Sequence, residues 1–266
     1  MTAAAFEDLQ RRYHERPDPP GPLASTRVRV GRLLASDPGG AWVADRDGEV
    51  VGCSLALVRE GVWGLSLLVV RPDAQSTGIG RELLARAWEY GSGARGWIVL
   101  ASRDPRALRS YARLGLELHP AAAARGRPRD VAAPPEVRRG TAADLPLTEA
   151  VDRAVRGAAH GDDILAMLEV GGDLLILPER GYAVVREGAV RQLAARDEEG
   201  AAALLRACFA AAGAREASVE WITSAQNWAV APCLDAGLEL RLEIGAVFLA
   251  GDVGPFAPYV PSGAYL

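Results

Sequence analysis

The chain has 266 residues, of which 49% are hydrophobic, and its formal net charge is −4. This length suits one large or two small domains, and the 30 basic residues, all arginines, are dispersed among acidic ones, which disfavours nucleic-acid binding. No apolar run reaches membrane-spanning length and no signal peptide opens the chain, so we expect a cytoplasmic protein without a membrane partner.

The first elements in the chain are expected to be helices. A short helix is predicted near Phe6–Tyr13, followed by an irregular, proline-rich connector, and a second helix over Thr26–Ala35. Two strands then form a hairpin, because Asp47-Gly48 separates the apolar runs at 41–44 and 50–58.

A glycine loop between a strand and a helix is the most informative feature. The run Leu65–Val70 is apolar and predicts a buried strand, which Pro72 ends. Gly78 and Gly80 allow a tight turn and a close approach of the backbone to a ligand. Amides at the start of the following helix form a ready anion site. The sequence therefore predicts a ligand that carries phosphate.

Two better-known phosphate loops do not fit this segment. The kinase and ATPase loop requires a lysine, which the chain lacks, and the dinucleotide fingerprint requires a third glycine where Leu83 stands. The segment Gln75-Ser76-Thr77-Gly78-Ile79-Gly80, after Val70-Arg71-Pro72, instead resembles the acetyl-CoA loop of the GNAT N-acetyltransferase family.

A second segment strengthens this resemblance. After a strand at Trp97–Ser102, Asp104 is expected to cap a helix that carries Tyr111 and ends at Gly115. This segment resembles the family's Asn-x-x-Ala-x-x-x-Tyr-x-x-x-Gly pattern, with Asp104 in place of the asparagine. Together the two segments extend the resemblance over about residues 40–119.

The resemblance implies acetyl transfer from acetyl-CoA to an amine. It assigns the acetyl and pantetheine groups to the backbone of Leu68 and Val70. Tyr111 would be the general acid, since a phenol stays protonated at neutral pH; packing against the sheet is the alternative role. The other cofactor-binding residues would be Gln75, Ser76, Thr77, Gly78, Ile79, Gly80, Arg81 and the helix cap Asp104.

The general base and the acceptor do not follow from the pattern. Glu60, His119 and a chain of waters all stay open as routes for the proton. The acceptor is expected to be an amine of a small molecule or a peptide. The missing base and the altered Asp104 also leave an alternative, a non-catalytic coenzyme A-binding or protein-interaction module.

The cysteines and histidines predict neither disulfides nor a metal site. An odd number of cysteines without a secretory signal indicates reduced thiols. Neither residue type has the spacing of metal ligands; the residues are Cys53, Cys208, Cys233, His14, His119 and His160.

The second half repeats the element order of the first. This repeat predicts two tandem copies of one α/β (α+β) fold, each a mixed, mostly antiparallel sheet flanked by helices. We place the domains at 1–125 and 126–266, with His119–Pro135 as the connector; a monomer and a homodimer both stay open. The expected elements of the second copy are strands at 174–177, 182–185, 190–194 and 217–223 and helices at 201–212 and 227–235.

The second copy has lost the features that predict phosphate binding. Its segment Arg196–Gly200 lacks Gly-x-Gly and brings three acids to the place of a pyrophosphate, where like charges repel. Leu234 stands where the family has its tyrosine. We therefore expect one acetyl-CoA site per chain, in the first half.

Two further expectations concern the ends of the sheet and of the chain. The first half lacks a clear opening strand before Ala41. The last stretch, Gly254–Leu266, contains three prolines, which exclude a helix, and several aromatic residues. We expect it to pack as an extended segment across the interface between the halves.

Overall fold

The computed structural model describes residues 2–13 and 23–266, so the connector expected after the first helix lies outside the described residues. The first half contains α1 (Thr2–Arg12), α2 (Leu23–Ser36), η1 (Pro38–Gly40), β1 (Ala41–Arg46), β2 (Glu49–Arg59), β3 (Val62–Val70), η2 (Pro72–Ala74), α3 (Ile79–Tyr90), β4 (Gly96–Ser102), α4 (Pro105–Arg113) and β5 (Glu117–Gly126). The second half contains β6 (Arg138–Arg139), η3 (Ala142–Asp144), α5 (Leu145–Val155), α6 (Asp162–Glu169), β7 (Asp173–Leu177), β8 (Gly181–Arg186), β9 (Ala189–Ala195), α7 (Glu198–Ala212), β10 (Ala217–Ile222), η4 (Ser224–Ala229), α8 (Val230–Asp235), β11 (Glu239–Gly251) and β12 (Tyr259–Val260).

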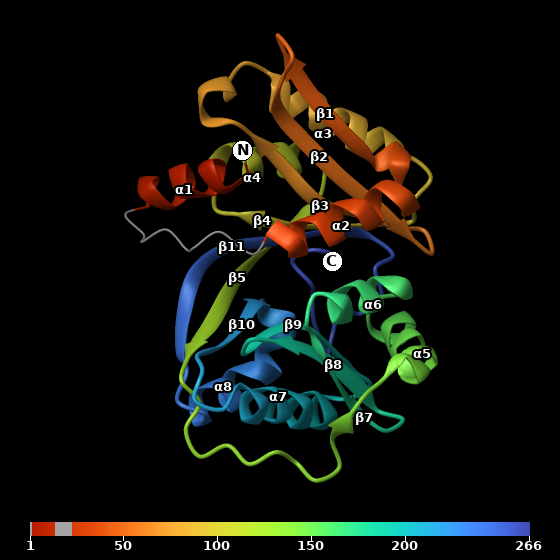
Figure 1. Cartoon of the computed structure of the whole chain (residues 1–266), viewed down its shortest axis with the longest axis vertical. Helices are drawn as coiled ribbons and strands as arrows, with labels where there is room; N and C mark the ends of the chain where they lie inside the picture. Colours follow the sequence, from red (N-terminus) through yellow and green to blue (C-terminus); the bar gives the residue numbers. More distant parts are fainter. Residues whose placement is uncertain (1, 14–22) are drawn as a thin grey trace.

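One continuous sheet joins the two halves. Its strand order is β1-β2-β3-β4-β11-β5-β10-β9-β8-β7-β6, and β12 pairs with β9 beside this path. The long strand β11 lies between β4 and β5, while β5 lies between β11 and β10 (Figure 1). Therefore β11, which follows the last helix of the second half, completes the sheet of the first half. In the same way β5, which follows the last helix of the first half, completes the sheet of the second half.

The connector predicted at His119–Pro135 is wrong over its first part. Residues up to Gly126 belong to β5, which pairs with β11 on one side and with β10 on the other. Alanine is uncommon in strands, so the run Ala121–Ala124 gave no strand pattern. Pairing on both edges overrides that weak local preference, and the small side chains allow Ala121, Ala123 and Ala124 to be buried.

Tight turns hold the hairpins of both halves. Asp47 and Gly48 have φ angles of 56° and 82°, which is the conformation of a two-residue turn between antiparallel strands, so the predicted hairpin of β1 and β2 is confirmed. Before β1, the described residues form only helices, and β1 is an edge of the sheet. The helix expected at Thr26–Ala35 is the longer α2, which packs against β2 and α6 at the junction of the halves (Figure 1).

The last segment of the chain packs into a core that both halves share. Phe256, Tyr259, Tyr265 and Leu266 are buried together with apolar side chains from α2, β2, α5, α6 and β8. β12 adds its backbone to β9, so the prediction of an extended, packed tail is confirmed. No helix in the described part of the chain is long and apolar enough to cross a membrane.

Candidate active site

The two central strands of the first half separate part-way along their length. β3 and β4 pair only from Val62 to Gly64, although both strands continue well beyond that point. The cause lies in β3, where Ser66 is an extra residue without a partner on β2, and such a bulge bends and twists its strand. From Leu65 to Val70, β3 therefore has no strand partner on the side that faces β4.

The glycine loop lies at the end of this opening. Gly78 has a φ of 96° at the N-cap of α3, a conformation that favours glycine. The side chains of Gln75 and Thr77 fasten the loop, since they donate hydrogen bonds to Val70 O at 3.1 Å and Ala74 O at 2.7 Å. The amides of residues 76 to 80 donate to no acceptor in the described residues, as is usual for the first turn of a helix. These amides can bind an anion.

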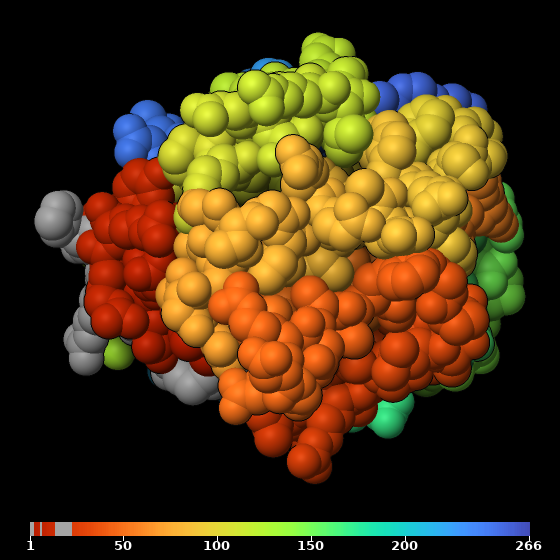
Figure 2. All heavy atoms as spheres, turned by 90° about the horizontal axis from the view of Figure 1, so that it is seen from above, coloured from red at the N-terminus to blue at the C-terminus, as the bar shows by residue number. Residues whose placement is uncertain are grey.

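A cavity of about 640 Å³ extends from the loop along the open strands. Figure 2 looks onto this face, where α1 (red), the loop with α3 (orange to yellow) and α4 (yellow-green) meet. Ile79 does not line the cavity, because its side chain points toward Gly52 in the sheet. Nine of the predicted cofactor-binding residues line it: Leu68, Val70, Gln75, Ser76, Thr77, Gly78, Gly80, Arg81 and Asp104.

The charge of this cavity suits a diphosphate. Four arginines and two aspartates line it, and one of the aspartates, Asp104, already accepts a hydrogen bond from Arg106 at 2.6 Å. Asp104 also caps α4 through the Arg106 amide, so this predicted cap is confirmed. Burial opposes ionisation of Asp104, but these hydrogen bonds from Arg106 keep its pKa below the ordinary value. Arginine side chains bind phosphate oxygens well because they offer paired donors.

A second, larger cavity of about 1510 Å³ opens on the other side of the separated strands, between the two halves. It shares Leu9, Leu68, Ser102 and Ala107 with the first cavity, so the two meet where β3 and β4 diverge. Its far wall comes from β5, β10 and β11. This arrangement would allow two ligands to meet from opposite sides of one opening.

Tyr111 lines the larger cavity near this meeting point. It lies one turn after Ala107 on the same face of α4, and its ring packs edge-on against Phe248 with centroids 5.5 Å apart. The side chain is 5% exposed. Burial, with a smaller contribution from the charge of Asp104, raises the pKa of Tyr111, so its hydroxyl stays a proton donor in alkaline solution.

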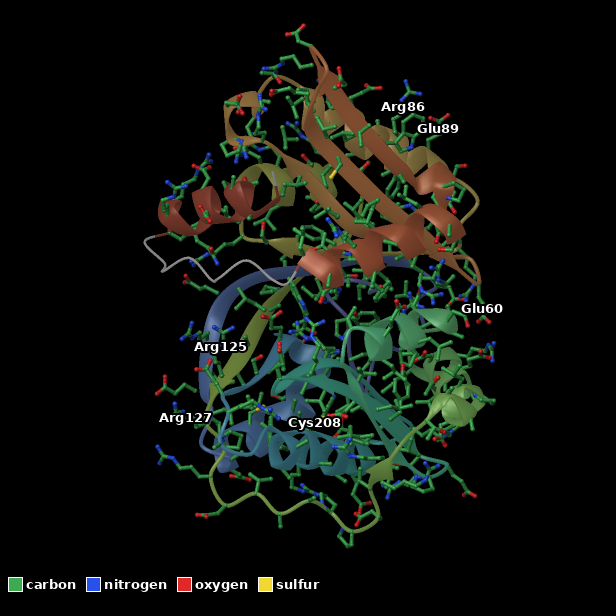
Figure 3. The ribbon with its side chains drawn as sticks, in the orientation of Figure 1. Glu60, Arg86, Glu89, Arg125, Arg127 and Cys208 are labelled. Atoms are coloured by element: carbon green, nitrogen blue, oxygen red, sulfur yellow. The ribbon has the colours of Figure 1, made fainter. Side chains whose placement is uncertain are left out.

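Neither side chain considered as the general base lines either of these two cavities. Glu60 binds the guanidinium of Arg153 at 2.7 Å and the Ala159 amide at 3.1 Å, at the edge of the molecule opposite Arg125 (Figure 3). His119 lies 3.7 Å from Glu117 on β5. Sequence reasoning missed several charged groups that line the larger cavity, because they come from α2 and from the second half: Arg29, Glu216, Glu220 and Glu243.

The corresponding opening in the second half is closed. β9 and β10 also diverge, pairing at Ser218 and Ala189 alone in the described structure. β12 lies against β9 in that space, and Ala195 donates a backbone hydrogen bond to Pro258 O at 3.1 Å. The side chain of Asp197 caps the start of α7, because it accepts a hydrogen bond from the Gly200 amide at 2.8 Å.

Residues 3–116 match the family model described as the acetyltransferase (GNAT) family. The first half of the chain belongs to the GNAT acetyltransferase family. No curated protein matches the sequence closely enough to add a relative. Solved structures extend the likeness to the whole chain, and they show its fold as a tandem GNAT fold, a mixed and mostly antiparallel sheet flanked by helices.

Three of these structures cover nearly the whole chain. A Pyrococcus horikoshii protein classed as an acetyltransferase superposes with a TM-score of 0.76 at 18% identity, over 99% of this chain and 93% of its own. A tandem GNAT protein from the clavulanic acid biosynthesis pathway gives 0.56 at 15% identity, over 94% and 93%. A GCN5-related N-acetyltransferase from Sphaerobacter thermophilus gives 0.55 at 17% identity, over 92% and 88%.

Proposed function

We propose that this GNAT protein is an acetyl-CoA-dependent N-acetyltransferase with one active site, in its first half, and that its acceptor is the amine of a small molecule or a peptide. The observation that carries the proposal is the meeting of two cavities where β3 and β4 diverge. One cavity has the loop amides and arginines that a diphosphate requires, and the other has room for an acceptor.

The residues of the first cavity fit acetyl-CoA. The amides of residues 76 to 80 and the Arg81 side chain would hold the pyrophosphate, and the open edge of β3 at Leu68 and Val70 would hold the pantetheine and acetyl groups. Bound acetyl-CoA supplies a thioester carbonyl that an amine can attack. The backbone amides of β3 are fixed in a sheet, so they can stabilise developing negative charge without reorganising.

Tyr111 would act at the leaving thiolate. Tyr111 lines the larger cavity beside the opening, and its raised pKa keeps its hydroxyl protonated. General acid catalysis of this kind contributes about 10²–10⁴-fold in rate. Removal of the proton from the amine falls to water or to the carboxylates Glu216, Glu220 and Glu243 of the cavity wall.

The direct test is release of free thiol from acetyl-CoA in the presence of a panel of amines, compared with the rate without amine. We expect amine-dependent release together with an acetylated product. Tight acetyl-CoA binding without transfer to any amine would overturn the catalytic proposal and favour the alternative, a coenzyme A-binding or protein-interaction module.

A further inference from the structure

Arg29 holds a fixed position at the point where the two strands separate. It comes from α2, and its Nε and Nη2 atoms donate to the Ser66 hydroxyl at 3.0 and 2.6 Å. Nη2 also donates to the Ser66 carbonyl, and the Ser66 hydroxyl in turn donates to Ala264 O at 2.6 Å. Because Ser66 is the bulged residue of β3, these bonds place the guanidinium beside the opening. Arg29 and Ser66 both line the larger cavity.

This guanidinium has no carboxylate partner among the described residues. No ion pair joins Arg29 to an acid within residues 2–13 and 23–266, and the Nη1 atom takes part in none of the bonds to Ser66. Desolvation by the surrounding protein lowers the pKa of Arg29, as expected for a cation that no anion neutralises. An uncompensated, poorly solvated charge is unfavourable, so an anionic ligand would gain strongly from meeting it.

Two other arginines of the cavity differ from Arg29 in this respect, and a third, Arg241, is exposed to solvent. Arg125 pairs with Glu216 at 3.2 Å, and Arg103 pairs with Glu243 at 3.3 Å. These pairs lie on the wall formed by β4, β5, β10 and β11, where Glu220 adds a further carboxylate. The α2 side of the cavity is therefore the place for an anion, while the acids of the opposite wall lie beside arginines.

Building on the proposed function, we propose that Arg29 binds a carboxylate of the acceptor, and that the acceptors are amines with a carboxylate a few bonds from the reacting nitrogen, a free amino acid being the simplest. Ser66 precedes Leu68, whose backbone would hold the acetyl group, by two residues, which is about 7 Å along a strand. A carboxylate bound to Arg29 leaves an α-amino group within reach of that position. A single arginine suits a monoanionic carboxylate better than a dianionic phosphate.

Steady-state kinetics with matched substrates tests this inference. Each free amino acid of a panel is compared with its amide and with the amine left when the carboxylate is removed. We expect the wild-type protein to prefer the free amino acid. Arg29→Gln should lower kcat/KM for the amino acid by about 10- to 100-fold, the value of a charge-assisted hydrogen bond, and change that for the amide by less than about threefold.

Two further variants serve as controls for this comparison. Arg27→Gln removes an exposed arginine of the same helix and should leave the preference unchanged. Arg29→Lys keeps the charge, so it should keep the preference for the carboxylate with a raised KM. Thermal unfolding and acetyl-CoA affinity are measured for each variant, and a loss confined to amino acid substrates in folded protein is the expected result.

The outcomes separate this inference from the function on which it rests. If amides or decarboxylated amines are acetylated as well as amino acids, or if Arg29→Gln lowers kcat/KM for all three equally, the carboxylate role of Arg29 is overturned and the acetyltransferase stands. If acetyl-CoA binds but no amine is acetylated, the proposed function itself is overturned, and the substrate class with it.

Discussion

The two halves build the same opening and use it differently. In the first half, the gap between β3 and β4 leads into two cavities. In the second half, the gap between β9 and β10 is occupied by β12, whose neighbour Pro258 accepts a hydrogen bond from Ala195. The chain's own tail thus takes, in the second half, the place that acetyl-CoA is proposed to take in the first.

The comparison teaches that a shared fold does not by itself supply a site. The first half has a glycine N-cap and amides that face outward, whereas Asp197 satisfies a corresponding amide of α7 and pairs with Arg180. The second half contributes to the first in another way, because β10 and β11 form a wall of the larger cavity. A half that is expected to bind no cofactor can still shape the proposed acceptor site.

Removing the tail should have the largest effect. Deleting residues 256–266 removes the buried hydrophobic side chains of Phe256, Tyr259, Val260, Tyr265 and Leu266, and opens the second gap. Each buried side chain of this size contributes about 1.5–3 kcal/mol, and whole proteins are stable by only about 5–15 kcal/mol. We expect the melting temperature to fall by at least about 10 °C, measured by calorimetry. Leu242→Ala, at a 74% exposed position, is the control; an unchanged melting temperature after the deletion would contradict a packing role.

Replacing the glycine N-cap should remove acetyl-CoA binding. Gly78→Glu puts a side chain at a φ of 96° and a negative charge among the loop amides. We expect one acetyl-CoA per wild-type chain and a Kd raised more than about 100-fold in the variant, equivalent to about 2.7 kcal/mol, by titration calorimetry. Gly93→Glu, where an added Cβ meets no atom within 4 Å, is the matched control. Two equivalent acetyl-CoA sites in the wild type would contradict the expectation that only the first half binds acetyl-CoA.

Sequence reasoning succeeded where the signal is local. The loop at Gln75–Gly80 and the helix that Asp104 caps are contiguous segments whose turn and cap chemistry can be read directly. The exchange of β5 and β11 between the halves could not be predicted, because it joins residues far apart and runs through alanines with little strand preference. Arg29 reaches the cavity from a helix outside the motifs, and its proposed role depends on a bulge at Ser66 that has no sequence signature.

Removing the Tyr111 hydroxyl should slow the chemistry and spare binding. We expect Tyr111→Phe to lower kcat by about 10²-fold, with acetyl-CoA affinity nearly unchanged, in single-turnover measurements. Leu234 is the second half's residue in the tyrosine position, so Leu234→Ala should leave kcat unchanged. Because burial raises the pKa of Tyr111, wild-type kcat should not fall from about pH 8 to about pH 10 through loss of this proton. An unchanged kcat in Tyr111→Phe would return the residue to a packing role.

Neutralising an acid at the start of α7 should have the smallest effect on stability. The same variant tests whether the acidic segment or the tail closes the gap between β9 and β10. Asp197→Asn removes the ion pair with Arg180 but keeps an oxygen that can cap the helix. We expect a loss of less than about 1 kcal/mol, since the pair is solvent-exposed. Chiefly through its hydrogen bond with Arg180, the folded protein holds the pKa of Asp197 below its ordinary value.

That stabilisation is therefore present above the ordinary aspartate pKa and is lost as the pH falls through the lower, folded value. The melting temperatures of wild type and Asp197→Asn should differ at neutral pH and converge in acid, whereas Glu198→Gln, a neighbouring exposed acid, should follow the wild type. Acetyl-CoA stoichiometry should stay at one in Asp197→Asn, because β12 still occupies the gap beside β9. A second site in this variant would show that the acidic segment, and not the tail, closes the second half.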